Sequence, residues 1–291
     1  MYEFYITTDS SCDLPAFYLD EPMFRVAALI FHINGVEYSN DLDGGVSSHD
    51  FCEMMRGGAT PTTSQVTPAR CYEEFEPILK EGRDILHLGF SSALSGSTNS
   101  AVIAADELRA KYPERKIIVI DTLAASLGQG LMVHLVLKKR KEGSNLEETA
   151  DYARSIIQNI CHYFTVDDLV YLYRGGRVSR TSAVLGGILG IRPILYVDPA
   201  GSLVPIGKVR GRKASLNALL EKMSAKLKGS TPDIVFISHA DCEGEAQNME
   251  NEIKKRFGAK YVLIHTIGPV ISAHVGPGTM AVFFLGDSRA E

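Results

Sequence analysis

Residues 84–160 alternate between short apolar segments and longer segments with helical periodicity. Residues 84–90 and 117–121 are rich in Ile, Leu and Val, as strands buried on both faces of a sheet usually are. Each is followed by a segment with the length and pattern of a helix, 95–111 after the first strand and 124–141 after the second. Strands and helices that alternate in this way form parallel sheets with helices on both faces. The sequence therefore predicts a doubly wound α/β domain.

The second half of the chain has a different pattern. Residues 192–198 and 203–209 are expected to pair as a hairpin, because a Pro-Ala-Gly turn separates two β-rich segments. Alternating helices and strands follow to the end of the chain. We place a domain boundary near residue 162. The expected organisation is an N-terminal α/β domain over 1–162, which holds the hydroxyl-rich loops, and a C-terminal α/β domain over 163–291.

The composition is that of an ordinary globular protein, and it argues against some classes of function. Hydrophobic residues make up 45% of the 291 residues and charged residues 22%, which allows a sizeable core. The net charge of −5 argues against a broad basic surface for nucleic acid. The five cysteines form no CxxC pair and their number is odd, which favours a reducing compartment. Because we find neither a signal-peptide pattern nor an apolar segment long enough to cross a membrane, we expect a cytoplasmic protein.

A hydroxyl-rich loop, residues 89–98, lies between the strand at 84–90 and its helix. It contains four serines and one threonine. It follows the carboxyl end of a strand, which is where ligands bind in open α/β sheets. The next helix presents unpaired N–H groups and the positive end of its dipole, and the hydroxyls add hydrogen-bond donors without adding charge. The loop therefore predicts binding of an anion, either a carboxylate or a phosphate.

The same loop also permits a catalytic interpretation. Residues 89–93, Gly-Phe-Ser-Ser-Ala, differ by one residue from the G-x-S-x-G pattern of serine hydrolases. Ser91 or Ser92, followed by Asp121 and then His274, would match the chain order of an α/β-hydrolase triad. A serine hydrolase is therefore the alternative function.

Further polar groups lie in other loops. Residues 62–65, Thr-Thr-Ser-Gln, form a second hydroxyl cluster, and His274 precedes the tight turn Gly276-Pro277-Gly278. Arginine and lysine gather at 174–180, RGGRVSR, and at 208–213, KVRGRK, where guanidinium groups would suit an acidic partner or a phosphate. The sequence contains neither a phosphate-binding glycine loop nor a close pairing of metal ligands.

Seven short motifs occur in a fixed order along nearly the whole chain. They are TDSS at 8–11, TTSQ at 62–65, SSALSGS at 91–97, DTLAAS at 121–126, GGRVS at 175–179, KVR at 208–210, and the segment 267–278, which runs from IGPV through His274 to Gly278. Each is weak alone. As an ordered set they resemble the DegV family, the fatty-acid-binding subunits of bacterial fatty acid kinases.

The resemblance implies two α/β domains with a lipid bound between them. The first would carry a mostly parallel, doubly wound sheet, and the second a mixed sheet flanked by helices. The acyl chain would lie in an apolar tunnel. Candidates for its lining are Leu29, Phe31, Ile188 and Leu189.

The resemblance also implies how the carboxylate of a long-chain fatty acid would be held. The residues at matching positions are Thr62 or Thr63, Ser92 with Ser91 as its neighbour, and His274. A buried carboxylate needs several hydrogen-bond donors, because otherwise it becomes protonated. Two hydroxyls and a histidine would supply those donors.

By the same resemblance, the protein is a carrier and not an enzyme. It would present its fatty acid to a separate ATP-dependent kinase, which makes acyl phosphate for phospholipid synthesis. Arg174, Arg177, Arg210 and Arg212 would face the kinase or the transferred phosphate. No cofactor other than the bound fatty acid is expected. A sugar-kinase-like domain is a third interpretation, because proteins of related fold bind dihydroxyacetone.

Overall fold

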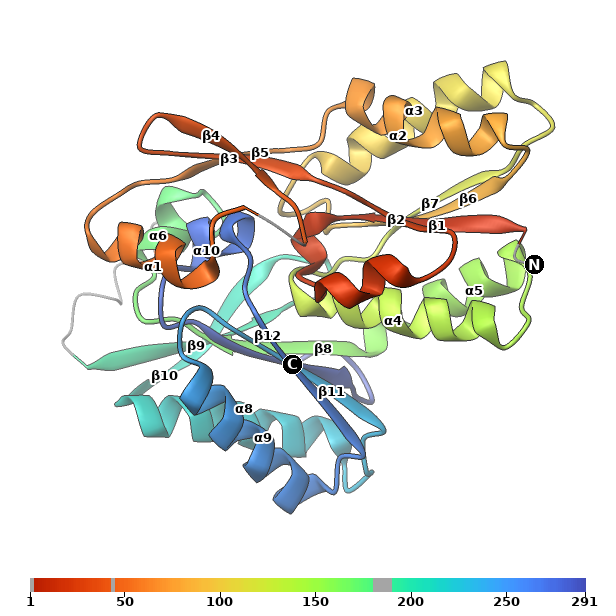
Figure 1. Cartoon of the computed structure of the whole chain (residues 1–291). Coiled ribbons are helices and arrows are strands. Elements are labelled where there is room, and N and C mark those ends of the chain that lie inside the picture. Colours follow the sequence, from red (N-terminus) through yellow and green to blue (C-terminus); the bar gives the residue numbers. More distant parts are fainter. Residues whose placement is uncertain (1–2, 43–44, 180–189) are drawn as a thin grey trace.

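The computed structural model describes residues 3–42, 45–179 and 190–291. Two large β-sheets lie on either side of a helix, and further helices cover their outer faces (Figure 1). The tunnel candidates Ile188 and Leu189 lie outside the described residues, as does Arg180 in the first basic segment.

The first sheet is parallel and has the strand order β2-β1-β6-β7. Its strands are β1 (Phe4–Asp9), β2 (Phe24–Ala27), β6 (Asp84–Gly89) and β7 (Ile117–Asp121), and the short helices η1 (Ser10–Cys12) and η2 (Ala16–Asp20) follow β1. Helices α2 (Pro68–Lys80) and α3 (Ser97–Lys111) cover one face, and α4 (Leu127–Lys141) and α5 (Leu146–Ile156) cover the other (Figure 1). Successive side chains of β6 point to opposite faces of the sheet. Ile85 packs in the core beside α2 and α3, whereas Leu86 and Leu88 pack in the core beside α4. The predicted doubly wound sheet is confirmed.

A small sheet beside the first one carries the second hydroxyl cluster. Its order is β4-β3-β5, with β3 (Leu29–Ile33), β4 (Val36–Asn40) and β5 (Thr62–Ser64), and helix α1 (Ser48–Arg56) lies between β4 and β5 in the chain. Asn34 and Gly35 join β3 to β4, and both have positive φ, 53° and 78°, as tight two-residue hairpin turns require. β5 is short and pairs only with β3, so Thr63 lies opposite Phe31.

The second sheet is mixed, with the order β10-β9-β8-β13-β11-β12. Its strands are β8 (Ile160–Thr165), β9 (Ile191–Val197), β10 (Leu203–Arg210), β11 (Ile234–His239), β12 (Tyr261–Thr266) and β13 (Met280–Leu285), and η3 (Ile157–Asn159) precedes β8. Helices α8 (Arg212–Leu227) and α9 (Glu243–Phe257) cover its outer face, while the short helices α6 (Val170–Arg174) and α10 (Pro269–Val275) follow β8 and β12 (Figure 1). The hairpin predicted over 192–198 and 203–209 is present as β9 and β10. The expected boundary near residue 162 falls inside β8.

Helix α4 joins the two sheets. Eleven of its fifteen residues are buried, and it contacts β6 of the first sheet and β8, β11 and β13 of the second. A helix buried on all sides fits such a position. Leu131 belongs to one continuous core with Leu88 of the first sheet and Phe236 of the second. Within the part of the chain that the structure describes, no helix has both the length and the apolar character needed to cross a membrane.

Candidate functional site

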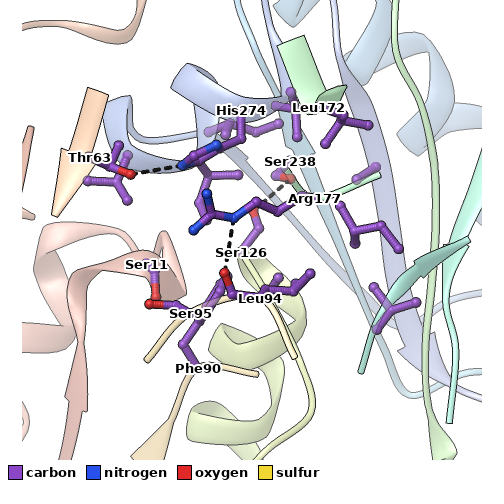
Figure 2. Close-up of a pocket in the computed structure, with 18 of the residues that line it drawn as sticks. Ser11, Thr63, Phe90, Leu94, Ser95, Ser126, Leu172, Arg177, Ser238 and His274 are labelled. Atoms are coloured by element: carbon purple, nitrogen blue, oxygen red, sulfur yellow. Dashed lines mark hydrogen bonds between the residues drawn. The ribbon is translucent and has the colours of Figure 1, made fainter. Parts of the chain in front are cut away.

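A cavity of about 230 Å³ lies between the second sheet and the loops of the first half of the chain. Apolar side chains from both halves form most of its wall, among them Leu29, Phe90, Phe164, Ile271 and Phe283. A polar cluster, which consists of Thr63, Ser95, Arg177 and His274, faces the cavity (Figure 2). The cavity therefore suits a ligand with a long apolar part and a polar head.

His274 and Thr63 form a hydrogen bond at the centre of the polar cluster. His274 Nε2 lies 2.8 Å from Thr63 Oγ1 (Figure 2), although the two residues are far apart in the chain. His274 is in the last turn of α10, and its Nδ1 has no hydrogen-bond partner among residues 3–42, 45–179 and 190–291. Burial lowers the pKa of His274 to about 4, and the nearby Arg177 charge adds to this effect. The imidazole is therefore neutral near pH 7.

Gly175 makes room for this imidazole. A Cβ atom at position 175 would lie 2.2 Å from His274 Nδ1, which is closer than side-chain atoms approach one another. The first glycine of the GGRVS motif is thus required by the packing of the histidine ring against the loop after α6.

Arg177 brings a positive charge to the cluster. Its Nε donates a hydrogen bond to Leu94 O at 3.0 Å, and its guanidinium also donates to Gly175 O. In Figure 2 the guanidinium lies between His274 and Ser95. Burial lowers the pKa of Arg177, yet a guanidinium stays protonated in proteins. Arg177 therefore supplies a fixed cation beside neutral hydrogen-bonding groups.

Ser95 lies directly before helix α3, whose N-cap is Gly96. Its Oγ is 3.1 Å from Ser97 Oγ and accepts a hydrogen bond from Ser97 N at 3.3 Å. Ser95 and Gly96 both line the cavity, so the N-terminus of α3 is next to the polar cluster. This is the anion-attracting end of the helix.

The structure does not place Ser91 and Ser92 at the cavity. Ser91 is fully buried and donates a hydrogen bond to Gly201 O at 2.8 Å. Ser92 is exposed, and its backbone N–H donates to the Asp121 carboxylate. The reason is that α3 begins at Ser97, two residues later than expected, so the turn at the start of the loop carries Ser91 and Ser92 away from the helix N-terminus. Of the serines at 91, 92 and 95, it is Ser95 that lines the cavity.

The structure separates the two threonines that the sequence left as alternatives. Thr63 lines the main cavity and bonds to His274, whereas Thr62 does not line that cavity. Thr62 is exposed and lines a second hollow of about 240 Å³. This outer hollow shares Thr63, Arg177 and His274 with the main cavity.

The remaining predicted arginines lie farther out. Arg174 is exposed and lines the outer hollow. Arg210 is exposed at the end of β10. Arg212 has two donors on Glu245, at 2.9 and 2.6 Å, and also faces Asp167, so its charge is paired inside the second half of the chain.

The hydrolase triad considered for the sequence is not assembled. Ser91 is bonded to Gly201, the Asp121 carboxylate accepts backbone N–H groups of Ser92 and Leu123, and His274 is bonded to Thr63. Of the tunnel candidates that the structure describes, Leu29 lines the cavity, whereas Phe31 packs in a separate core between the small sheet and α1.

Sequence reasoning missed Ser95 and the inward position of Arg177. A signal for Ser95 was present, because Gly96 directly before the polar start of a helix marks the residues nearest to the unpaired N–H groups. No comparable signal existed for Arg177, since its position depends on the carbonyl oxygen of Leu94, which is distant in the chain.

The sequence pattern of the DegV family, described as a family of uncharacterised proteins, matches residues 3–287. The chain belongs to the DegV family. A DegV domain-containing protein of Clostridium perfringens is 42% identical over 289 residues, which cover 99% of each chain. The resemblance seen in the ordered motifs is thereby confirmed.

Solved DegV structures have the same fold. A DegV lipid-binding protein from Thermotoga maritima matches with a TM-score of 0.87 at 28% identity, over 99% of this chain and 100% of that one. A DegV family protein from Thermus thermophilus, described as binding fatty acid, also matches with a TM-score of 0.87 at 28% identity, over 98% of this chain and 99% of that one. The α/β architecture expected for a DegV protein is confirmed.

Proposed function

We propose that this DegV protein binds a long-chain fatty acid, with the carboxylate at the polar cluster and the acyl chain in the apolar part of the cavity. The observation that supports this most strongly is a cavity with apolar walls that carries hydroxyl, imidazole and guanidinium groups in one cluster. The relatives described as binding lipid or fatty acid support the same ligand class. Burial of the chain contributes roughly 0.8 kcal/mol per CH₂, so the chain provides affinity and the cluster provides orientation.

The carboxylate would be held by one charge and several neutral donors. Arg177 neutralises its charge, and the Ser95 hydroxyl and the start of α3 add donors. If His274 carries its proton on Nε2, it donates to Thr63 Oγ1, and the Thr63 hydroxyl proton is then free to point to the carboxylate. Ser95 takes the role first expected of Ser91 and Ser92.

We further propose that the protein is a cytoplasmic carrier for an ATP-dependent fatty acid kinase. The kinase would transfer the γ-phosphoryl group of ATP to a carboxylate oxygen, which gives acyl phosphate for phospholipid synthesis and ADP. Arg174 lines the outer hollow next to the polar cluster, and Arg210 is exposed, so both are free to meet an acidic partner or the phosphoryl group. All five cysteines are free thiols, which fits a reducing compartment.

Native mass spectrometry of the purified protein tests lipid binding directly. We expect a bound mass equal to that of a long-chain fatty acid, and uptake of palmitate or oleate after delipidation. Ser95→Ala should lower the affinity, whereas Ser92→Ala, a matched change outside the cavity, should leave it unchanged. A protein that carries no fatty acid and takes up neither palmitate nor oleate would show that the proposal is wrong.

The carrier role needs a separate measurement with a purified fatty acid kinase. Arg174→Ala and Arg210→Ala should keep lipid occupancy and lower the rate of acyl phosphate formation. Loss of lipid occupancy in either variant would contradict the division between lipid-holding and kinase-facing residues. Full acyl phosphate formation by both variants would remove these arginines from the kinase contact.

A further inference from the structure

His162 lies in the cavity away from the polar cluster. On β8, His162 and Phe164 are two residues apart, so they share one face of the strand, and both line the cavity. The chain leaves β8 after Thr165 and leads through α6 to Arg177. The end of β8 that leads to the polar cluster is therefore nearer to Phe164 than to His162. His162 lies about 6.6 Å deeper along the strand than Phe164.

The surroundings of His162 are otherwise apolar and tightly packed. Val197 and Phe283, on the strands that flank β8, line the same part of the cavity. The Phe283 and His162 rings pack edge to face, with their centroids 5.4 Å apart. On the other side α4 approaches closely, because a Cβ at Gly128 would lie 1.9 Å from His162 Nε2. Gly128 is thus what allows an imidazole at this position.

The imidazole of His162 lacks a hydrogen-bond partner. The residue is only 2% exposed, and neither ring nitrogen is hydrogen-bonded to any part of the chain that the structure describes. The backbone carbonyl of Ile160 is near enough to raise the pKa of His162 slightly, but it forms no hydrogen bond of normal geometry with either ring nitrogen, and it accepts Arg289 Nε at 2.9 Å. Burial lowers the pKa of His162 well below 6.5, so the ring is neutral and offers one donor and one acceptor. A buried polar group without a partner is unfavourable, and few native structures keep one without a reason.

Other polar side chains that line the cavity away from the cluster have partners within the protein. Ser126 Oγ donates to Asp13 at 2.6 Å and lies 3.2 Å from Ser238 Oγ (Figure 2). Thr279 Oγ1 donates to backbone carbonyl oxygens of Val275 and Gly276. His162 differs from these hydroxyls because its hydrogen-bonding capacity is unused.

We propose that His162 gives the cavity a preference for fatty acids that carry a hydrogen-bonding group on the acyl chain, of which a hydroxyl is the simplest. This inference rests on the proposed function, since it concerns the chain of the same ligand. A hydroxyl can donate to the unprotonated ring nitrogen or accept from the protonated one. A wholly apolar cavity would reject a hydroxylated chain, because the hydroxyl would be buried without a partner. A site built to bond a hydroxyl disfavours the analogue that lacks it.

The test compares stearate with a series of hydroxystearates in which the hydroxyl moves along the chain. Dissociation constants are measured by competition on delipidated protein. We expect the wild type to bind at least one isomer more tightly than stearate, and His162→Phe to weaken that isomer by about tenfold, the value of one hydrogen bond. Stearate should bind His162→Phe at least as tightly as the wild type, because the variant removes a buried imidazole that stearate leaves without a partner. Phe164→Leu, on the same face of β8, changes the shape of the cavity wall but not its hydrogen-bonding groups, so as the matched control it should shift the dissociation constants of stearate and of the hydroxystearate together.

Each outcome is decisive. The inference is overturned if the wild type binds every isomer more weakly than stearate. It is also overturned if the ratio of the dissociation constants for stearate and the hydroxystearate is the same in His162→Phe as in the wild type. If circular dichroism shows that His162→Phe is unfolded, His162→Gln takes its place. Glutamine keeps a donor and an acceptor, so this variant should retain part of the preference for the hydroxystearate. The ratio of the two dissociation constants in the wild type then still tests the inference. Wild-type protein that binds neither stearate nor any isomer would refute the proposed function instead.

Discussion

Thr63 and His274 show how a single hydrogen bond defines one end of the site. They lie 211 positions apart in the chain, and their side chains meet at 2.8 Å beside Arg177 and Ser95. Neither residue could hold a carboxylate alone, because neither a threonine hydroxyl nor a neutral histidine carries a charge to balance it. The site exists where β5, α6, α10 and the start of α3 come together.

Replacing Thr63 with valine should lower fatty acid affinity by at least about tenfold, since the change removes a hydroxyl donor to a charged group and keeps the shape of the side chain. Calorimetric titration of delipidated protein with oleate measures the effect. Thr62→Val is the matched control, because Thr62 is exposed and does not line the main cavity, so its replacement should not change affinity. Equal losses in both variants would contradict the assignment of Thr63.

The sequence pointed to the hydroxyl-rich loop that reaches the cavity, but it favoured Ser91 and Ser92, whereas Ser95 is the residue that lines the cavity. Which serine faces the ligand depends on where α3 begins, and that start is set by tertiary contacts such as the bond from Val66 N to Ser97 Oγ at 3.1 Å. Ser91 instead bonds to Gly201 on the β9–β10 turn. Contacts between distant segments leave no pattern in a single sequence, so local spacing could not distinguish Ser92 from Ser95.

At the scale of elements, the loop after α6 controls the position of α10. The backbone of Gly175 lies against the His274 ring so closely that a methyl group at position 175 would be only 2.2 Å from Nδ1. Tight packing of this kind transmits small changes in one element to another.

Gly175→Ala should therefore displace the His274 ring and lower fatty acid affinity several-fold while the protein remains folded. Gly207→Ala is the control, because a Cβ at Gly207, on β10, meets nothing within 4 Å. Binding titrations on both variants, with circular dichroism to confirm folding, measure the difference. Unchanged affinity in Gly175→Ala would mean that the position of the ring does not matter for binding.

Elements were the level at which the sequence was most informative. The apolar strand at 117–121 and the hairpin around residue 200 have strong local patterns, and both appear in the structure. The position of β13 between β8 and β11 could not be read from the sequence, because the last strand of the chain inserts between strands made much earlier. The boundary predicted near residue 162 falls inside β8.

For the whole molecule, α4 makes the two sheets a single core. Leu131 is fully buried in the cluster that spans both sheets. Leu131→Ala should lower the free energy of unfolding by roughly 2–5 kcal/mol, as large-to-small changes in a core do. Native-state hydrogen exchange should show lower protection in β6 and β11 alike. A loss of protection confined to one sheet would indicate two independently stable halves.

Acid should destabilise the protein through its buried histidines. Burial lowers the pKa of His87 from 6.5 to about 4 in the folded state. Between these values the unfolded chain binds a proton that the folded chain does not, so stability is complete above pH 6.5 and falls as the pH drops through this window. The contribution of one such histidine is roughly 1.4 kcal/mol per pH unit. Urea unfolding should therefore show a shallower pH dependence for His87→Gln than for the wild type, and parallel curves would contradict this.

The long separation between the two sides of the polar cluster also has a consequence for protein synthesis. When the ribosome has completed β7, Thr63 and Ser95 have been made, but Arg177 and His274 have not. The cavity has only part of its wall at that stage, because β8, β9, α10 and β13 are still missing. A nascent chain thus has no complete cavity until nearly the last residues emerge. Any stabilisation that the ligand gives by mass action therefore reaches only finished chains.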